Sequence, residues 1–236
     1  MKKLKIFSLA SKFESTTNIF NNKIYLNNIK KKLTTKKKNK LPNNSILFLL
    51  IENLDKNKKI KLLDFGGGSG EYYMNYKLPN NLFVDVFDTK ELTEMGKKYS
   101  KSKLNFISNS NKLSKKYDIV FVNSVFQYIK NLNKIIFFLL KFNPDKIIFS
   151  DFYGSDNKKF SVVQNYYNQK TIFYFHSLDN LVQKMKKKNY RLNFISAFVP
   201  YIFNKMQYYD TTNLPRKFQS NFAYNLIFLK KKNNVR

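Results

Sequence analysis

Short apolar runs alternate with amphipathic segments along most of the chain. Runs rich in Val, Ile, Phe and Leu predict strands, and segments whose apolar residues recur every three or four positions predict helices. We expect strands over residues 59–65, 81–87, 103–108, 117–123, 145–151, 191–199 and 222–231. We expect helices over residues 45–54, 71–77, 89–100, 131–142 and 176–190, and a short one near 17–32. This alternation is typical of an α/β protein.

The predicted strands are continuously apolar, which indicates burial on both faces of a parallel sheet. Helices between successive strands indicate crossover connections that cover both faces. The last two strands differ, because the segment 200–221 between them contains two prolines and no helical pattern. They predict an antiparallel pair at one edge. We therefore predict an α/β fold with a Rossmann-like doubly wound seven-stranded sheet, mostly parallel with an antiparallel C-terminal strand pair.

The length of 236 residues fits one domain with an appendage. Residues 1–42 are polar, basic and weakly patterned, and we interpret them as an N-terminal extension or linker. Residues 43–231 form the predicted domain, and residues 232–236 a basic tail. Residues 152–175 fall where such a fold needs only a turn, so we predict an insertion that covers the ligand site as a lid.

The formal net charge of +29 raises the question of a nucleic-acid partner. Only three of the 44 basic residues are arginine, the residue that phosphate and base recognition favours. Together with abundant Asn, Ile, Phe and Tyr, this bias is typical of an AT-rich coding sequence. Solvated lysines of low specificity are one interpretation, and a polyanion-binding patch at residues 30–40 is the other.

The chain contains no cysteine, which excludes disulfides and thiolate metal sites, and we expect no metal ion. The apolar stretch near the start is shorter than the apolar region of a signal peptide. The apolar runs 46–51 and 135–140 are far too short to span a bilayer. The expectation is a soluble cytoplasmic protein without a transmembrane segment.

The stretch LLDFGGGSGEYY (62–73) places four of the chain's six glycines directly after a predicted strand. In a doubly wound sheet, the turn after the first strand is the expected ligand site. A phosphate loop would need a Lys–Ser/Thr pair that this turn lacks. In a G-x-G-x-x-G fingerprint, the last glycine would fall on Glu71 or Tyr73. The spacing that fits is D-x-G-x-G-x-G, made by Asp64, Gly66, Gly68 and Gly70.

With this motif the chain resembles the class I S-adenosylmethionine-dependent methyltransferases. The resemblance implies that the loop backbone, which includes Gly67, packs under the adenosine and methionine parts of S-adenosylmethionine, and that Asp64 orients the amino acid end. It also implies an acidic residue at the end of the second strand, bonded to the ribose hydroxyls. Asp88 fits that place, with Asp85 as the other candidate. The alternative role for Asp88 is a helix cap.

Two further polar residues follow strands at the same edge. Asn109 comes after the third strand, where the resemblance implies a contact with adenine, and Asn123 ends the fourth. The match is closer to a subgroup of methyltransferase-like proteins that are often encoded among surface-polysaccharide genes. It rests on residues 62–73, 118–129 and 162–181. The chain departs from that subgroup in lacking tryptophan and in carrying Asp151 and Phe152 after the fifth strand.

Transfer to a hydroxyl acceptor needs a general base as well as alignment. Asp151, at the end of the fifth strand, and His176, the only histidine, are the candidate catalytic residues, and each has a purely structural role as its alternative. Gln127 and Tyr128, just after the fourth strand, and Gln164, in the insertion, are the candidate acceptor-binding residues.

The sequence thus predicts an S-adenosylmethionine-dependent methyltransferase that acts on a small molecule or sugar, with a role in surface-glycan biosynthesis. Two alternatives stay open. The positive charge favours an RNA methyltransferase. The lack of an obvious general base favours a non-catalytic module that keeps the fold or binds the cofactor without turnover.

Overall fold

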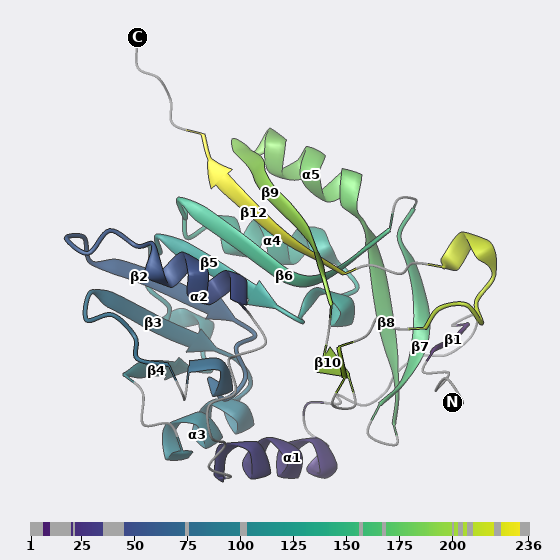
Figure 1. Ribbon diagram of the computed structural model, residues 1–236, viewed down its shortest axis with the longest axis horizontal. Coiled ribbons are helices and arrows are strands. Elements are labelled where there is room, and N and C mark those ends of the chain that lie inside the picture. Colours follow the sequence, from purple (N-terminus) through teal and green to yellow (C-terminus); the bar gives the residue numbers. More distant parts are fainter. Residues whose placement is uncertain are drawn as a thin grey trace.

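A computed structural model gives the arrangement of most of the chain (Figure 1). The residues it describes are 7–9, 20, 22–34, 45–73, 76–99, 103–155, 158–166, 169–199, 201–202, 205–206, 210–219 and 223–231. Their strands are β1 (Phe7–Leu9), β2 (Ile60–Phe65), β3 (Leu82–Phe87), β4 (Leu104–Ile107), β5 (Ile119–Asn123), β6 (Lys146–Ser155), β7 (Phe160–Tyr166), β8 (Gln169–Ser177), β9 (Tyr190–Phe198), β10 (Tyr201–Ile202), β11 (Lys205–Met206) and β12 (Ala223–Lys230). Their α-helices are α1 (Lys23–Thr34), α2 (Ser45–Glu52), α3 (Lys90–Tyr99), α4 (Leu132–Leu140) and α5 (Leu178–Lys187). Short 3-10 turns are η2 (Glu71–Tyr73), η3 (Ser110–Lys112), η4 (Phe126–Tyr128) and η5 (Arg216–Phe218).

The main part of the sheet has the strand order β4-β3-β2-β5-β6-β12-β9. Neighbours from β4 to β6 are parallel, and β12 is antiparallel to both β6 and β9. These strands correspond one by one to the seven predicted from the sequence. The predicted antiparallel C-terminal pair is confirmed, with Leu226 opposite Ile195. The α/β class and the mostly parallel main sheet are confirmed as well.

The predicted count of seven strands is wrong, because ten of the described strands form one sheet. Strand β6 continues past Asp151, and at its end Gly154 pairs in parallel with His176 of β8. Strand β8 forms an antiparallel hairpin with β7, whose other edge takes β1. The segment 152–175 is therefore a strand extension and a β-hairpin, and Figure 1 shows this hairpin running steeply across the ends of the main strands.

The helices follow the predicted ranges with one exception. The segment 71–77 forms only the 3-10 turn η2 in its described part, and residues 74–75 lie outside that part. In the turn, the Tyr73 amide donates to the Gly70 carbonyl three residues earlier. The glycines before it therefore open into a tight turn rather than an α-helix.

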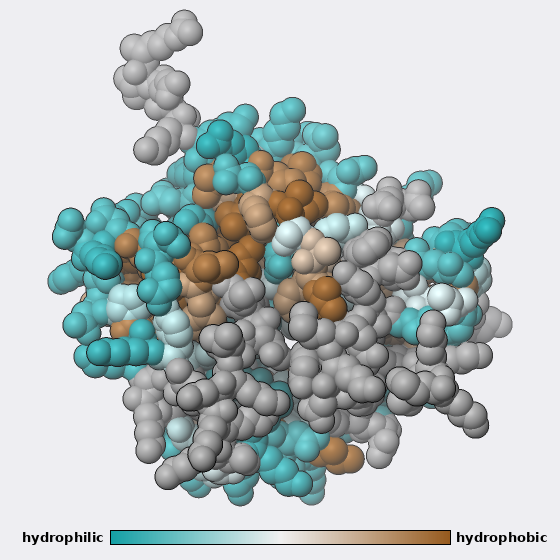
Figure 2. Space-filling model, in the orientation of Figure 1, coloured by the Kyte–Doolittle hydropathy of each residue, from teal (hydrophilic) through white to brown (hydrophobic). Residues whose placement is uncertain are grey.

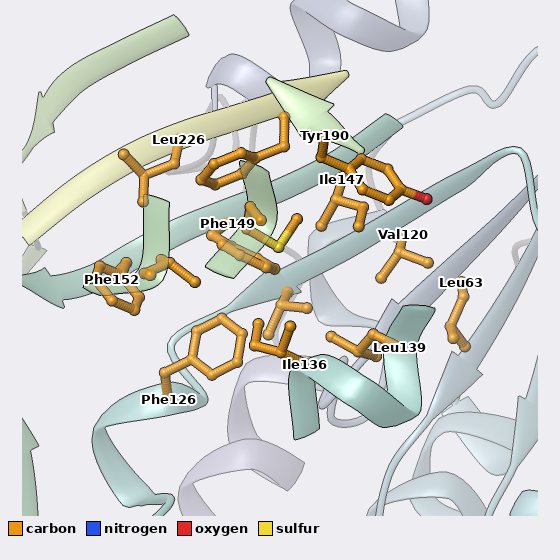
Figure 3. Packing of buried hydrophobic residues seen from close by; sticks show 14 of the residues in the cluster. Leu63, Val120, Phe126, Ile136, Leu139, Ile147, Phe149, Phe152, Tyr190 and Leu226 are labelled. Atoms are coloured by element: carbon orange, nitrogen blue, oxygen red, sulfur yellow. The ribbon is translucent and has the colours of Figure 1, made fainter. Parts of the chain in front are cut away.

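The core lies on both faces of the main sheet, because successive side chains of a strand point to opposite faces. Leu62 packs against α2 through Leu47 and its neighbours, whereas Leu63 belongs to the cluster that includes α4 and α5. Figure 3 shows the second cluster, in which the rings of Phe126, Phe149 and Phe152 lie close to one another. This cluster sets the position of the ends of β5 and β6.

The segment 1–42, predicted as an extension or linker, contributes β1 to the sheet and α1 against α3. Phe7 is buried between Phe173 and Phe175 of the hairpin, and Ile29 of α1 is also buried. The described parts of this segment thus fold onto the domain. The end of the basic run 30–40 beyond Thr34 lies outside the described residues, as do Pro42 and the tail 232–236.

Apolar side chains also reach the surface where β9 and β12 cross the upper middle of the view in Figure 2. Phe194 of β9 keeps 42% of its surface exposed. Among the described helices, none combines the length and apolar character that a membrane crossing requires.

Candidate functional site

The glycine loop leaves the carboxyl end of β2 between β3 and β5. Strand order reverses at this point, since β3 lies on one side of β2 and β5 on the other. Such a switch point opens a crevice for a ligand at the strand ends. Gly66, Gly68 and Gly70 have positive φ angles of 76°, 61° and 69°, which residues with a Cβ atom resist. The motif spacing is therefore a backbone requirement of this turn.

The space around the glycines distinguishes their roles. A Cβ on Gly67 would lie 2.4 Å from Oδ2 of Asp64, and one on Gly66 would lie 2.3 Å from Cγ2 of Val125. Those two glycines are enclosed by protein atoms. A Cβ on Gly68 would meet no atom within 4 Å. Gly68 thus borders open space, which is where a ligand can approach the main chain.

Asp64 lies beneath this loop and is 1% exposed. Its Oδ2 has no hydrogen-bond partner among the described residues. Burial raises the pKa of Asp64 to about 7, and the nearby charge of Asp88 adds to the rise, whereas the Tyr73 hydroxyl opposes it. A buried carboxylate oxygen without a donor is costly, so it suggests that a bound cationic or N–H group completes the site.

Asp88 follows β3 and binds the loop from the opposite side. Its Oδ2 accepts a 2.7 Å hydrogen bond from the Gly68 amide, and its Oδ1 accepts one of 2.6 Å from the Thr89 amide. Burial raises its pKa, and both hydrogen bonds oppose that rise. Asp85 is oriented elsewhere, toward Asn105 and Tyr117 at 2.9 and 2.5 Å. Of the two acidic residues considered from the sequence, Asp88 is the one at the loop.

Asn123 ends β5 and donates from Nδ2 to the Tyr72 hydroxyl at 2.9 Å. Burial raises the pKa of Tyr72, as do the charges of Glu71, Asp151 and Asp64. Tyr72 therefore lies within the electrostatic reach of two buried carboxyl groups, those of Asp64 and Asp151. Sequence reasoning missed Tyr72, because a tyrosine after a glycine turn carries no pattern of its own.

Ser124 and Asp151 directly follow Asn123 and Ser150, which are paired on the neighbouring strands β5 and β6. Both have positive φ, 53° for Asp151 and 56° for Ser124, and the Ser124 hydroxyl donates to Oδ2 of Asp151 at 2.5 Å. Burial raises the pKa of Asp151 to about 7, opposed by Ser124, Tyr153 and Gln127 in that order. Its Oδ1 has no hydrogen-bond partner in the described part of the chain.

No family model matches the sequence, and no curated protein matches it. Solved structures do match. A methyltransferase from Clostridium acetobutylicum that depends on S-adenosylmethionine shares 12% sequence identity, with 91% of this chain and all of that chain covered, at a TM-score of 0.55. This chain has the S-adenosylmethionine-dependent methyltransferase fold.

Two other solved structures share this methyltransferase fold. Magnesium protoporphyrin IX methyltransferase (ChlM) from Synechocystis PCC 6803, solved with bound SAH, shares 10% identity over 90% of this chain and 96% of that one, at a TM-score of 0.56. A methyltransferase from Mesorhizobium loti shares 7% identity over 80% and 98%, at a TM-score of 0.51. At these identities the likeness shows the fold alone.

In this methyltransferase fold, His176 lies on β8 and is 2% exposed. Its Nε2 is 2.9 Å from the Phe126 carbonyl, which can only accept, so Nε2 carries the proton. Burial lowers the pKa of His176 to about 4. The ring stacks on Phe152 at 6.1 Å between centroids. A catalytic role for His176 stays a prediction from the sequence.

The candidate acceptor residues lie on η4 and the hairpin. The Tyr128 hydroxyl donates to Oε1 of Gln164 at 3.3 Å, and Gln164 is fully buried. Nε2 of Gln164 and Oε1 of Gln127 have no partner among the described residues. Gln127 lies beside Asp151, which is within β6, so the structure brings these two residues together.

Asn109 is placed differently from the others. Its side chain is exposed and accepts a 2.9 Å hydrogen bond from the Asn111 amide, which caps η3. The adenine contact implied by the resemblance therefore stays a prediction. Asp64 and Asp88 lie at the glycine loop. Asn123 binds Tyr72, which follows that loop, and the next residue, Ser124, binds Asp151.

Proposed function

We propose that this protein is an S-adenosylmethionine-dependent methyltransferase that acts on a small molecule or sugar. The observation that carries the proposal is Oδ2 of Asp64, a buried carboxylate oxygen without a partner among the described residues, beneath a glycine loop that is open at Gly68. An ammonium group of the donor's amino acid end would satisfy that oxygen. A pyrophosphate would be repelled by it.

The residues of the crevice fit the donor in complementary ways. Asp64 would hold the amino group, and the missing side chain of Gly68 leaves room for the donor against the main chain. Asp88 would bind the ribose hydroxyls with the carboxylate that now holds the loop. Asn123 and Tyr72 would border the methionine part from the end of β5. When bound, the donor supplies an electrophilic methyl carbon attached to a sulfonium.

Polar residues on η4 and the hairpin support a sugar or another small molecule with hydroxyl groups as the acceptor. Gln127, Tyr128 and Gln164 are uncharged and able both to donate and to accept hydrogen bonds. Such groups suit a hydroxyl-bearing molecule such as a sugar. We extend the proposal to surface-polysaccharide biosynthesis in the cytoplasm, as the sequence resemblance suggests.

Isothermal titration calorimetry with S-adenosylmethionine and S-adenosylhomocysteine tests the proposal. We expect both to bind, and Asp64→Asn to weaken binding while thermal unfolding shows an intact fold. Absence of binding by both at millimolar concentration would refute a donor site. Donor binding without S-adenosylhomocysteine formation across a broad acceptor panel would instead favour a non-catalytic module. Methylation of RNA with strongly salt-dependent binding would favour the RNA alternative.

A further inference from the structure

The Ser124–Asp151 pair is a strained arrangement at the edge of the proposed site. Only four non-glycine residues of the described chain have positive φ, and two of them are hydrogen-bonded to each other here. Residues held in this region are strained and persist where the surrounding structure determines them. The strands fix the pair directly, since Asn123 lies opposite Ser150 and the Ser124 amide donates to the Ser150 carbonyl.

The geometry leaves one carboxylate oxygen of Asp151 available. Ser124 occupies Oδ2, whereas Oδ1 is buried and has no hydrogen-bond partner among the described residues. None of the ion pairs formed by those residues involves Asp151. A buried carboxylate with neither a cation nor a donor on one oxygen needs an explanation, and a bound substrate hydroxyl would supply it.

The neighbouring polar atoms indicate the chemistry of that substrate. Oε1 of Gln127 can accept a hydrogen bond, and Nε2 of Gln164 can donate one, and both atoms are unpartnered in the described part of the chain. Gln127 lies beside Asp151, and the next residue, Tyr128, donates to Gln164. Oδ1 of Asp151 and Oε1 of Gln127 therefore give a set of two neighbouring acceptors without a positive charge. This set matches a molecule that carries several neutral hydroxyl groups better than it matches a carboxylate or a phosphate.

We infer that Oδ1 of Asp151 removes the proton from a hydroxyl group of a neutral polyhydroxy acceptor, and that Ser124 is the positioning residue that holds the carboxylate for this step. This inference rests on the proposed function and specifies its acceptor. The acceptor oxygen forms a bond to the methyl carbon while the carbon–sulfur bond breaks and its electron pair stays on sulfur. The hydroxyl proton passes to Asp151, so the products are a methyl ether, a neutral thioether and a protonated carboxyl.

The pKa of Asp151 is raised, which is the direction that a general base requires. The groups that face it are Ser124, Gln127 from η4, Tyr153 from β6 and Tyr72 from η2. His176 lies beyond Phe152 and stays neutral above about pH 4 because burial lowers its pKa. With a pKa raised to about 7 by burial, Asp151 is a stronger base than an exposed aspartate and is still partly ionised at neutral pH.

The test uses two substitutions that keep the backbone conformation. Asp151→Asn retains a residue that tolerates positive φ, and Ser124→Gly removes the hydroxyl where glycine is unstrained. S-adenosylhomocysteine formation is measured with neutral polyols and sugars, with amines and with carboxylic acids as acceptors. S-adenosylhomocysteine affinity is measured on the same proteins by calorimetry, which monitors the donor site separately.

We expect turnover with the neutral polyhydroxy class and a rate that rises with pH through about 7. Asp151→Asn should lower the rate about 100-fold or more, as loss of a general base does, and leave donor affinity unchanged. Ser124→Gly should move the pH profile to higher pH, because the hydroxyl that holds the pKa of Asp151 down is gone.

Three results would overturn the inference while the donor still binds. One is turnover with amines or acids instead of hydroxyl acceptors. Another is an Asp151→Asn variant with the parent rate and pH profile. The last is no product with any hydroxyl acceptor. Loss of donor binding in the parent protein would instead refute the proposed function itself.

Discussion

The carboxylate of Asp88 and the amide of Gly68 are joined by a 2.7 Å hydrogen bond, across the gap between the end of β3 and the loop after β2. The acidic residue therefore shapes the loop before any ligand is present. A charged hydrogen bond of this kind is worth about 1.5–3 kcal/mol. The loop and the acidic residue behave as one unit, which the following substitution tests.

Replacement of Asp88 by alanine should weaken S-adenosylhomocysteine binding about 10- to 100-fold, because both the loop contact and the ribose acceptor are lost. Asp85→Ala is the matched control. Asp85 is bonded to Asn105 and Tyr117 rather than to the loop, so donor affinity should stay within about twofold. Calorimetry measures both, and equal losses in the two variants would contradict the assignment of Asp88.

The glycines of the loop should respond to alanine in different ways. Gly68→Ala has room for its methyl group but has to adopt a φ of 61°, which costs about 1 kcal/mol and lowers Tm by about 2–4 °C. Its donor binding should be lost, since the methyl group fills the open space. Gly67→Ala should unfold at a markedly lower temperature, because its Cβ would lie 2.4 Å from Asp64. Thermal unfolding with calorimetry compares them, and normal donor binding by Gly68→Ala would be inconsistent with a ligand at that space.

Donor affinity should depend on pH through Asp64. The free carboxyl has a pKa raised to about 7 by burial, and an ammonium partner favours the ionised form. Binding at pH 6 should therefore release a proton, and affinity should rise with pH up to about 7 and then level off. Calorimetry in two buffers of different ionisation enthalpy detects the proton. In Asp64→Asn the proton release should vanish, and its persistence would point to another group.

Asp151 should also make stability depend on pH. Its pKa rises from 3.8 to about 7 on folding because of burial, so the folded state binds more protons between these values. Its favourable contribution is complete below about pH 4 and is lost as pH rises to about 7. Asp151→Asn should therefore unfold at a higher temperature than the parent at pH 8, and the difference should shrink toward pH 4. Thermal scans across that range measure it, and a constant difference would contradict a raised pKa.

The substitution His176→Gln distinguishes a structural role of His176 from a catalytic one. The glutamine amide can still donate to the Phe126 carbonyl, as Nε2 of His176 does. Because that nitrogen is occupied and burial lowers the pKa of the ring to about 4, we expect most of the turnover to remain. S-adenosylhomocysteine formation checks this. A loss as large as that of Asp151→Asn, with donor affinity unchanged, would assign the general base to His176 instead.

Local pattern in the sequence determined the main sheet and the glycine loop of the proposed donor site. Seven strand ranges followed from apolar runs, because a strand buried on both faces has to be apolar throughout. Four clustered glycines identified the turn, because its backbone needs positive φ at three of them and has no space for a side chain at the fourth, Gly67. The spacing from Asp64 to Asp88 pointed to the carboxylate that lies at the loop.

Tertiary structure alone decided the contacts among the residues of the proposed acceptor half. The Ser124–Asp151 bond joins residues 27 positions apart, and the Tyr72–Asn123 bond joins residues 51 apart. No local period encodes such contacts, because they depend on β5 lying between β2 and β6. The hairpin that extends the sheet has the same origin, since Gly154 and His176 become neighbours only once β6 and β8 pair. Residue types and short spacings are properties of the chain, whereas the distance between two strand ends is a property of the sheet.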